Sequence, residues 1–170
     1  MRVRKATIID SAGLAKVQVD SYRIAYAGIL PQDYLDLFTY AEQTQDWREL
    51  LSNRMDDLLY VAETEAGEIT GYALGRPGVS DIPTYDSELV ALHVRLPCQG
   101  KGIGRQLSQT IAAQLKASGC TSMMLWVLAQ NQRARQFYEE LGGELLDQTK
   151  QSGAGALEVA YGWDELNSLT

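Results

Sequence analysis

The sequence is poor in the residue types that form disulfides, metal sites and membrane spans. It contains two cysteines, Cys98 and Cys120, and a single histidine among 170 residues, which is too few for a disulfide framework or a cysteine–histidine metal site. No apolar run approaches the roughly 20 residues that a membrane-spanning helix needs. The basic N-terminus is followed by a short apolar run that ends at Asp10, so we expect no signal peptide. These deficits predict a cytoplasmic protein with reduced thiols, no metal and no membrane contact.

Positive charge is also in deficit. The chain has 15 Lys and Arg residues against 22 Asp and Glu, a formal net charge of −7. A nucleic-acid surface requires clustered basic residues, so we expect no nucleic-acid partner. The negative charge is compatible with a cationic substrate such as an amine or a polyamine. A length of 170 residues with 45% hydrophobic and 22% charged residues predicts one globular domain over residues 1–170.

The most informative segment is a glycine-rich turn at residues 99–105, Gln-Gly-Lys-Gly-Ile-Gly-Arg. It separates a strand-like run at 89–94 from a helix-like run at 103–117. Such a turn presents backbone N–H groups to an anion, because glycine lacks a Cβ and a helix N-terminus has unpaired donors. It is not a Walker loop, since no hydroxyl residue follows Lys101, and it is not a dinucleotide fingerprint, since Leu107 replaces the third glycine. We therefore expect a phosphate-bearing ligand.

A second motif follows the apolar run at residues 122–128. Residues 131–142 read Asn-x-x-Ala-x-x-Phe-Tyr-x-x-Leu-Gly, in which Asn131, Ala134, Tyr138 and Leu141 are offset by three, seven and ten positions. These offsets place the four residues along one face of a helix. A helix and a strand separate the two motifs, and their order makes the combination far more specific than either alone.

The two motifs together resemble the GCN5-related N-acetyltransferase (GNAT) family. In that family a Gln/Arg-x-x-Gly-x-Gly/Ala loop, matched here by Gln99, Gly102 and Gly104, binds the pyrophosphate of acetyl-CoA, and the second motif is a later helix. The chain is most similar to the single-domain bacterial members related to the polyamine acetyltransferase PaiA. The resemblance implies the GNAT acyl-CoA N-acyltransferase fold with acetyl-CoA as cofactor.

Local patterns predict the order β-α-α-α-β-β-β-α-β-α-β-β. That order is an α/β (α+β) arrangement with a central mixed sheet of six to seven strands and helices on both faces. The expected strands cover residues 2–9, 58–63, 68–74, 87–94, 120–128, 142–149 and 157–163. The expected helices cover residues 11–27, 31–38, 41–53, 102–118 and 131–141.

The resemblance also implies the reaction and the residues that serve it. Acetyl-CoA would give its acetyl group to the primary amine of a small molecule, polyamine or amino-acid-like, by direct transfer in a ternary complex. Backbone groups of the strand before the glycine turn would bind pantetheine, and the turn would bind pyrophosphate. The expected cofactor-binding residues are Leu92, His93, Val94, Gln99, Gly100, Lys101, Gly102, Ile103, Gly104, Arg105, Asn131 and Tyr138.

Two side chains are candidates for proton transfer. By resemblance, the Tyr138 hydroxyl is the general acid that protonates the departing thiolate. Glu88 opens the strand that leads to the cofactor and is the candidate base, with Asp86 and Tyr85 as alternatives. His93 alternates with Leu92 and Val94, so we expect it on the opposite face of the sheet rather than in the role of base.

Other functions remain open on the sequence. Within the same class, the acceptor could be a protein N-terminus or a lysine. In a different class, the chain could be a non-catalytic acyl-CoA-sensing regulator, although a sensor has no need of the acid at Tyr138. An unrelated nucleotide-binding protein is the remaining alternative. The resemblance and the exposed edges of a mixed sheet also predict a homodimer.

Overall fold

The computed structural model describes residues 1–53 and 57–169, which form a seven-stranded mixed sheet in the order β1-β2-β3-β4-β5-β7-β6. This confirms the expected fold class. The strands are Arg2–Lys5 (β1), Leu58–Glu63 (β2), Ile69–Pro77 (β3), Ser87–Val94 (β4), Met123–Leu128 (β5), Glu144–Gln151 (β6) and Leu157–Trp163 (β7). The helices are Ser11–Ala25 (α1), Gln32–Asp36 (α2), Tyr40–Asn53 (α3), Ile103–Ala117 (α4) and Gln132–Glu140 (α5).

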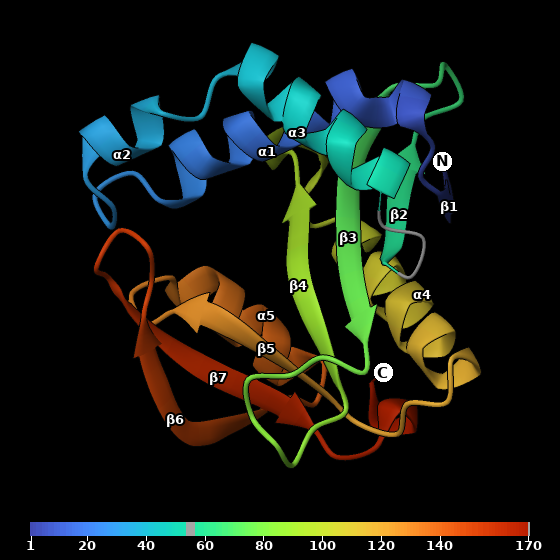
Figure 1. The fold of residues 1–170 in the computed structure, drawn as a ribbon, viewed down its shortest axis with the longest axis vertical. Helices are drawn as coiled ribbons and strands as arrows, with labels where there is room; N and C mark the ends of the chain where they lie inside the picture. The colour runs from blue at the N-terminus through green and yellow to red at the C-terminus, as the bar shows by residue number, and fades with distance from the viewer. Residues whose placement is uncertain (54–56, 170) are drawn as a thin grey trace.

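Helices cover both faces of the sheet (Figure 1). We call the two sides the α1 face, which α1 and α3 cover, and the α4 face, which α4 and α5 cover. Apolar side chains spaced four apart on α4, Leu107, Ile111 and Leu115, are fully buried against the sheet, as an amphipathic helix requires. None of the described helices is long and apolar enough to cross a membrane.

The first strand is shorter than the sequence pattern predicts. It ends at Lys5, and Ile8–Asp10 form a 3-10 turn instead. The buried Asp10 carboxylate explains the change, because it accepts hydrogen bonds from the Thr7 backbone N–H at 2.8 Å and from Arg4 at 2.8 Å. The alternation of side chains alone did not reveal that Asp10 turns inward.

Two strands in the middle of the sheet meet at one end and then diverge. The parallel pairing of β4 with β5 is limited to Glu88 and Met124, and the two strands separate beyond that pair (Figure 1). The Asp86 carboxylate holds the meeting point: its oxygens accept from the N–H and hydroxyl groups of Thr121 and Ser122 at 2.8–3.2 Å. The Ser87 hydroxyl adds a 2.6 Å hydrogen bond to the Ser122 carbonyl.

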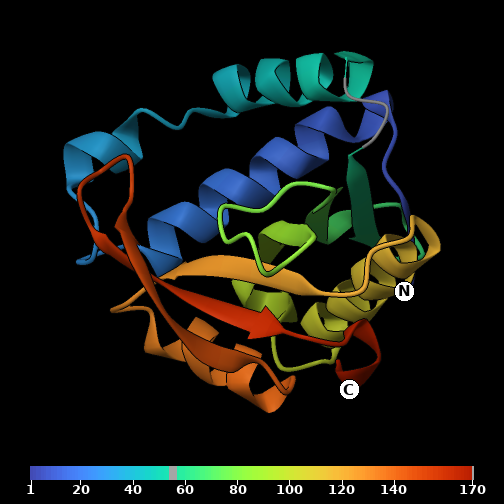
Figure 2. The ribbon, with the colours of Figure 1, turned by 60° about the horizontal axis from the view of Figure 1, so that its bottom comes forward.

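Two connections lie over the α1 face of the diverging strands. The β6–β7 hairpin packs beside α2 (Figure 2), where Ala154 and Ala156 contact a cluster that contains Leu30, Leu35 and Leu128. The loop of residues 78–86 covers the other end, where Ile82 packs on Met124, Ala160 and Trp126. The α1 face of β5 and β7 therefore carries two separate apolar clusters.

Loss of the Asp86 charge should weaken the junction of β4 and β5. Asp86→Asn replaces an oxygen that accepts hydrogen bonds by an amide that faces N–H and hydroxyl donors, so we expect a loss of about 1–3 kcal/mol in the free energy of unfolding. Urea unfolding at pH 7 measures it. Asp147→Asn, at an exposed position of β6, is the matched control.

The Asp86 carboxylate should also make the free energy of unfolding depend on pH in the acidic range. Burial alone would raise the pKa of Asp86, but the hydrogen bonds from Thr121 and Ser122 lower it below the ordinary 3.8. A lowered pKa in the folded state contributes stability above pH 3.8, and this contribution is lost as the pH falls through the folded-state value. The difference in stability between the parent and Asp86→Asn should therefore shrink at pH 3. An equal difference at pH 7 and pH 3 would contradict this role.

Candidate functional site

The glycine turn presents a row of unpaired backbone N–H groups. Gly100 and Gly102 have φ angles of +73° and +78°, a conformation in which glycine has no steric penalty. A Cβ placed on either residue would meet no atom within 4 Å, so the space in front of the turn is open. The first backbone bond after the turn runs from the Gln106 N–H to the Gly102 carbonyl at 3.0 Å, and the N–H groups of residues 100–104 donate to no backbone carbonyl among the described residues. This arrangement fits an anion.

Side chains of the turn fix its shape. The Gln99 amide donates to the Val94 carbonyl at 2.7 Å and ties the turn to the end of β4, while the Lys101 ammonium donates to the Pro97 carbonyl at 3.0 Å. The Ile103 side chain is buried in the core of the α4 face, and Arg105 is exposed. Among these sequence-predicted residues, the structure therefore gives Gln99 and Ile103 packing or bonding roles in the turn itself.

Gly104 serves a different purpose from Gly100 and Gly102. It lies inside α4, and a Cβ on it would lie 3.1 Å from Cζ of Phe137 on α5. A larger residue there would push the two helices apart. A small residue at position 104 therefore serves the packing of α4 on α5 as well as the expected approach of a phosphate.

Beyond an irregularity at Val90, the side chains at the end of β4 alternate between the two faces of the sheet, as expected. Pairing with β3 joins Ala91 to Leu74 and Leu89 to Gly75, so Val90 forms a β-bulge. A bulge bends its strand and re-aims the side chains around it. Leu92 and Val94 then pack toward the α4 face. The sequence analysis missed this bulge, because nothing in the residue pattern marks it.

His93 lies on the α1 face, opposite to Leu92 and Val94 as predicted. Its ring lies between those of Tyr22 and Tyr72, with centroids 5.3 Å from each. Burial lowers the pKa of His93 to about 4, so the imidazole is neutral near pH 7. A neutral ring packed between tyrosines fits a structural role better than that of a base.

Tyr138 is held in the core, but its hydroxyl has no partner. The side chain is 9% exposed and packs against Phe137, Tyr161 and Trp163. No described residue hydrogen-bonds to its hydroxyl, and the oxygen is not among the fully buried unpaired polar atoms, so it keeps some exposed surface. Burial raises the pKa of Tyr138 well above 10, and the group stays protonated near pH 7. It is therefore available as a proton donor.

Tyr138 of α5 contributes to the electrostatic environment of a tyrosine on the α1 face. The pKa of Tyr26 is raised first by burial and then by Tyr22, Tyr138 and Glu158. Asn131 begins the same helix, where its side-chain oxygen accepts from the Ala134 N–H at 3.2 Å. Asn131 is thus the N-cap of α5.

Glu88 lies on the α1 face beside the opening between the diverging strands β4 and β5. It is half-buried, and burial followed by the charge of Asp81 raises its pKa above the ordinary 4.5. No hydrogen bond or ion pair joins its carboxylate to the described residues. The alternatives are engaged: Asp86 accepts the bonds described above, and the Tyr85 hydroxyl donates to Asp164 at 2.9 Å. Glu88 is therefore the unpaired carboxylate of the three candidates.

Glu158 is a second half-buried carboxylate at the opening, and the sequence analysis did not identify it. It lies on β7 opposite Leu128 of β5, and burial also raises its pKa. An acidic residue between Leu157 and Val159, inside an apolar strand, was the signal that could have found it. Among the described residues, no group of three His, Cys, Asp or Glu side chains could hold a metal ion.

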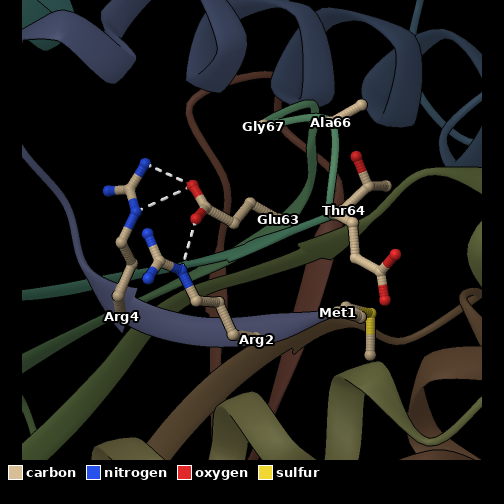
Figure 3. A pocket seen from close by; sticks show the side chains of 8 residues that line it. Met1, Arg2, Arg4, Glu63, Thr64, Ala66 and Gly67 are labelled. Atoms are coloured by element: carbon tan, nitrogen blue, oxygen red, sulfur yellow. Dashed lines mark hydrogen bonds and ion pairs between the residues drawn. The ribbon is translucent and has the colours of Figure 1, made fainter.

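A surface hollow of about 730 Å³ lies away from this region, at β1 and the turn between β2 and β3 (Figure 3). Three of its charged side chains bind one another. Glu63 pairs with Arg2 and with Arg4, each at 2.6 Å, and Arg4 also pairs with Asp10 at 2.8 Å. These ion pairs stabilise the edge of the sheet.

Comparison with known proteins agrees with the geometry. Residues 25–143 match the acetyltransferase (GNAT) family. YuaI of Bacillus subtilis, described as an uncharacterized N-acetyltransferase, is 35% identical over 169 residues, which cover 98% of this chain and 95% of that protein. The chain belongs to the GNAT family. It is therefore an acetyltransferase, as the resemblance of the two motifs predicted.

Solved structures share the GNAT fold at low sequence identity. The PaiA N-acetyltransferase of Thermoplasma acidophilum, crystallised with coenzyme A, has a TM-score of 0.73 at 22% identity, covering 95% of this chain and 98% of that one. The ribosomal-protein-alanine N-acetyltransferase of Brucella melitensis has a TM-score of 0.72 at 22% identity, covering 96% and 99%. These two structures match about equally well, and only one of them is named for its acceptor, so the fold leaves the acceptor of this GNAT protein open.

Proposed function

We propose that the protein transfers the acetyl group of acetyl-CoA to a primary amine of a small cationic molecule. One observation supports the proposal: the pairing of β4 with β5 is limited to Glu88 and Met124, so the end of β4 that leads into the glycine turn keeps a free edge. When bound, acetyl-CoA supplies an activated acetyl group as a thioester. The residues of this chain bind it, position the amine and move protons.

The proposed binding uses mainly backbone groups. The N–H groups of Gly100, Lys101, Gly102, Ile103, Gly104 and Arg105 would bind the pyrophosphate, with Lys101 and Arg105 adding positive charge. The free edge of β4 at Leu92, His93 and Val94 would bind the pantetheine chain, as an added strand would. Asn131 would contribute through its amide nitrogen, since its oxygen caps α5.

The proposed proton transfers use groups on the two sides of the opening. Glu88, on the α1 face, would take a proton from the acceptor ammonium, directly or through a water molecule. Tyr138, from the α4 face, would donate a proton to the sulfur as it leaves. Burial raises the pKa of both groups, which keeps the tyrosine protonated and makes the carboxylate a stronger base.

The competing acceptors are a protein N-terminus and a lysine side chain. Both require a peptide to reach the end of β4, whereas α2, the β6–β7 hairpin and the loop of residues 78–86 pack on the α1 face of the neighbouring strands. A compact amine fits these surroundings better. A non-catalytic acyl-CoA sensor would bind CoA without releasing thiol in the presence of any amine. Turnover of acetyl-CoA with amines, amino acids and peptides therefore separates these functions.

Two broader expectations of the sequence remain predictions. A cytoplasmic location follows from the reduced thiols. A homodimer follows from the family resemblance and from β6, which forms one edge of the sheet and exposes Leu145.

The glycine turn should be required for CoA binding. Gly102→Ala introduces a Cβ at φ +78°, which costs about 1 kcal/mol of stability and places a methyl group before the N–H donors. We expect at least a tenfold weaker Kd for CoA by calorimetry in the presence of chelator. Gly67→Ala, at φ +80° in the β2–β3 turn with equally open space, carries the same strain. Equal CoA affinity in both variants would show that the turn does not bind the cofactor.

Removal of the Tyr138 hydroxyl should slow turnover and leave binding intact. Tyr138→Phe keeps the ring in the core, so we expect a kcat lower by roughly tenfold to a thousandfold with the KM for acetyl-CoA little changed. Thiol release at saturating amine measures it. Tyr60→Phe, on β2 away from the opening, should behave as the parent. A parental kcat for Tyr138→Phe would assign the residue to packing.

Glu88 should set the acid limb of the pH profile. A base must be deprotonated, and burial raises the pKa of Glu88, so kcat/KM should rise with pH through a midpoint above 4.5. Glu88→Gln should lower kcat/KM at pH 7 and remove this limb, because an amide takes up no proton. An unchanged acid limb in the variant would assign the base to another group.

A further inference from the structure

The orientation of Tyr138 is set by its neighbours rather than by its own hydroxyl. That hydroxyl has no hydrogen-bond partner among the described residues. The ring packs against two side chains of β7, with its centroid 6.2 Å from that of Tyr161 and 6.4 Å from that of Trp163. Because Tyr138 belongs to α5, the place of its hydroxyl depends on how α5 is held against β7.

The same two residues of β7 hold α5 by hydrogen bonds. The Trp163 indole N–H donates to the Leu141 carbonyl at 3.0 Å, immediately after the helix ends. The Tyr161 hydroxyl accepts from Nε of Arg135 at 3.1 Å and donates to the Glu139 carboxylate at 2.5 Å. Arg135 and Glu139 are four residues apart, so they lie on one face of α5. A single phenol on the strand therefore holds that face of the helix.

The Tyr161 hydroxyl also reaches the connection that precedes α5. The Arg135 guanidinium that donates to it donates to the Ala129 carbonyl as well, at 3.1 Å. Tyr161 itself is fully buried. Burial, followed by the hydrogen bond to Glu139, raises the pKa of Tyr161 above the ordinary 10.0, so near pH 7 the hydroxyl is protonated and continues to donate. Hydrogen bonds to charged partners are stronger than those between neutral groups.

On another side, α5 is held by packing alone. The Phe137 ring lies against the start of α4, where a Cβ on Gly104 would be 3.1 Å from it. Apolar contacts have no preferred direction, whereas hydrogen bonds do. The rotation of α5 about its own axis therefore depends on the bonds of Tyr161. A catalytic group misplaced by about 1 Å can lose on the order of a hundredfold in rate, so this rotation matters to a proton donor.

We propose that Tyr161 is a positioning residue for acetyl transfer. Its hydroxyl, bonded to Arg135 and Glu139, sets the rotation of α5 that directs the Tyr138 hydroxyl toward the departing sulfur. Tyr161 acts through Tyr138 and not on the reacting atoms. This inference rests on the proposed function and on the assignment of Tyr138 as the general acid.

Removal of the Tyr161 hydroxyl tests the proposal. Tyr161→Phe keeps the ring in the core, and the glycine turn is unchanged. We expect a kcat lower by roughly threefold to thirtyfold, with the KM for acetyl-CoA and the Kd for CoA little changed. Thiol release at saturating amine gives the kinetic values, and calorimetry gives the Kd. A parental kcat would overturn the proposal.

A double-mutant cycle separates positioning from a general structural role. If Tyr161 acts through the Tyr138 hydroxyl, Tyr161→Phe should have no further effect on kcat in a protein that already carries Tyr138→Phe. A residue that merely supports the fold would lower kcat by the same factor in both backgrounds. Equal factors in the two backgrounds would therefore overturn the proposal.

A variant at the surface of α5 tests the network without a change in the core. Glu139→Ala removes the carboxylate that accepts from Tyr161, and Glu139 is exposed. We expect it to lower kcat in the same direction as Tyr161→Phe. Glu140→Ala removes the neighbouring exposed carboxylate, which makes no hydrogen bond or ion pair with the described residues, and should keep the parental kcat. Equal kcat values in the two variants would overturn the role of the network.

The failure of this inference is distinct from the failure of the proposed function. A parental kcat for Tyr161→Phe, beside a slow Tyr138→Phe, overturns the inference and leaves the acetyltransferase activity and its proton donor standing. A parent protein that neither binds CoA nor releases thiol with any amine overturns both.

Discussion

The arrangement of the site depends on the way in which β4 and β5 are joined. The Asp86 carboxylate and the Ser87 hydroxyl hold the first residues of the two strands together, and the pairing stops at Glu88 and Met124. A parallel pair that continued would saturate its backbone groups and close the sheet. Because it stops, β4 keeps a free edge that leads into the glycine turn.

Burial then decides what each polar group around that edge can do. It keeps His93 neutral, keeps the Tyr138 hydroxyl protonated and raises the pKa of Glu88 and Glu158. The fold compensates the charged groups at its outer edge, where Arg2 and Arg4 bind Glu63, but leaves both carboxylates at the opening unpaired. Unpaired buried polar groups weaken a fold. Several of them close together are expected where a bound ligand supplies their hydrogen-bond or charge partners.

The glycines of one short motif meet different physical requirements. Gly100 and Gly102 adopt positive φ angles in front of open space, whereas Gly104 has an ordinary helical conformation and lies against Phe137. The two motifs of the sequence are thus connected in the structure, because the start of α4 packs on the helix that carries Tyr138. The spacing between the glycine turn and Tyr138 depends on this contact.

The sequence by itself determined the order of the elements, the mixed sheet, the glycine turn and the helix of Tyr138, because local periodicity and short motifs depend on neighbouring residues. It also placed His93 on the face opposite to Leu92. It could not show that Asp10 turns inward or that Val90 forms a bulge. Nor could it show that the Asp86 carboxylate accepts hydrogen bonds at the junction of β4 and β5. It also could not join Tyr161 to Arg135 and Glu139, which precede it by 26 and 22 residues. Only the tertiary structure decided these relations, because burial and the pairing of charges are set by contacts between distant segments.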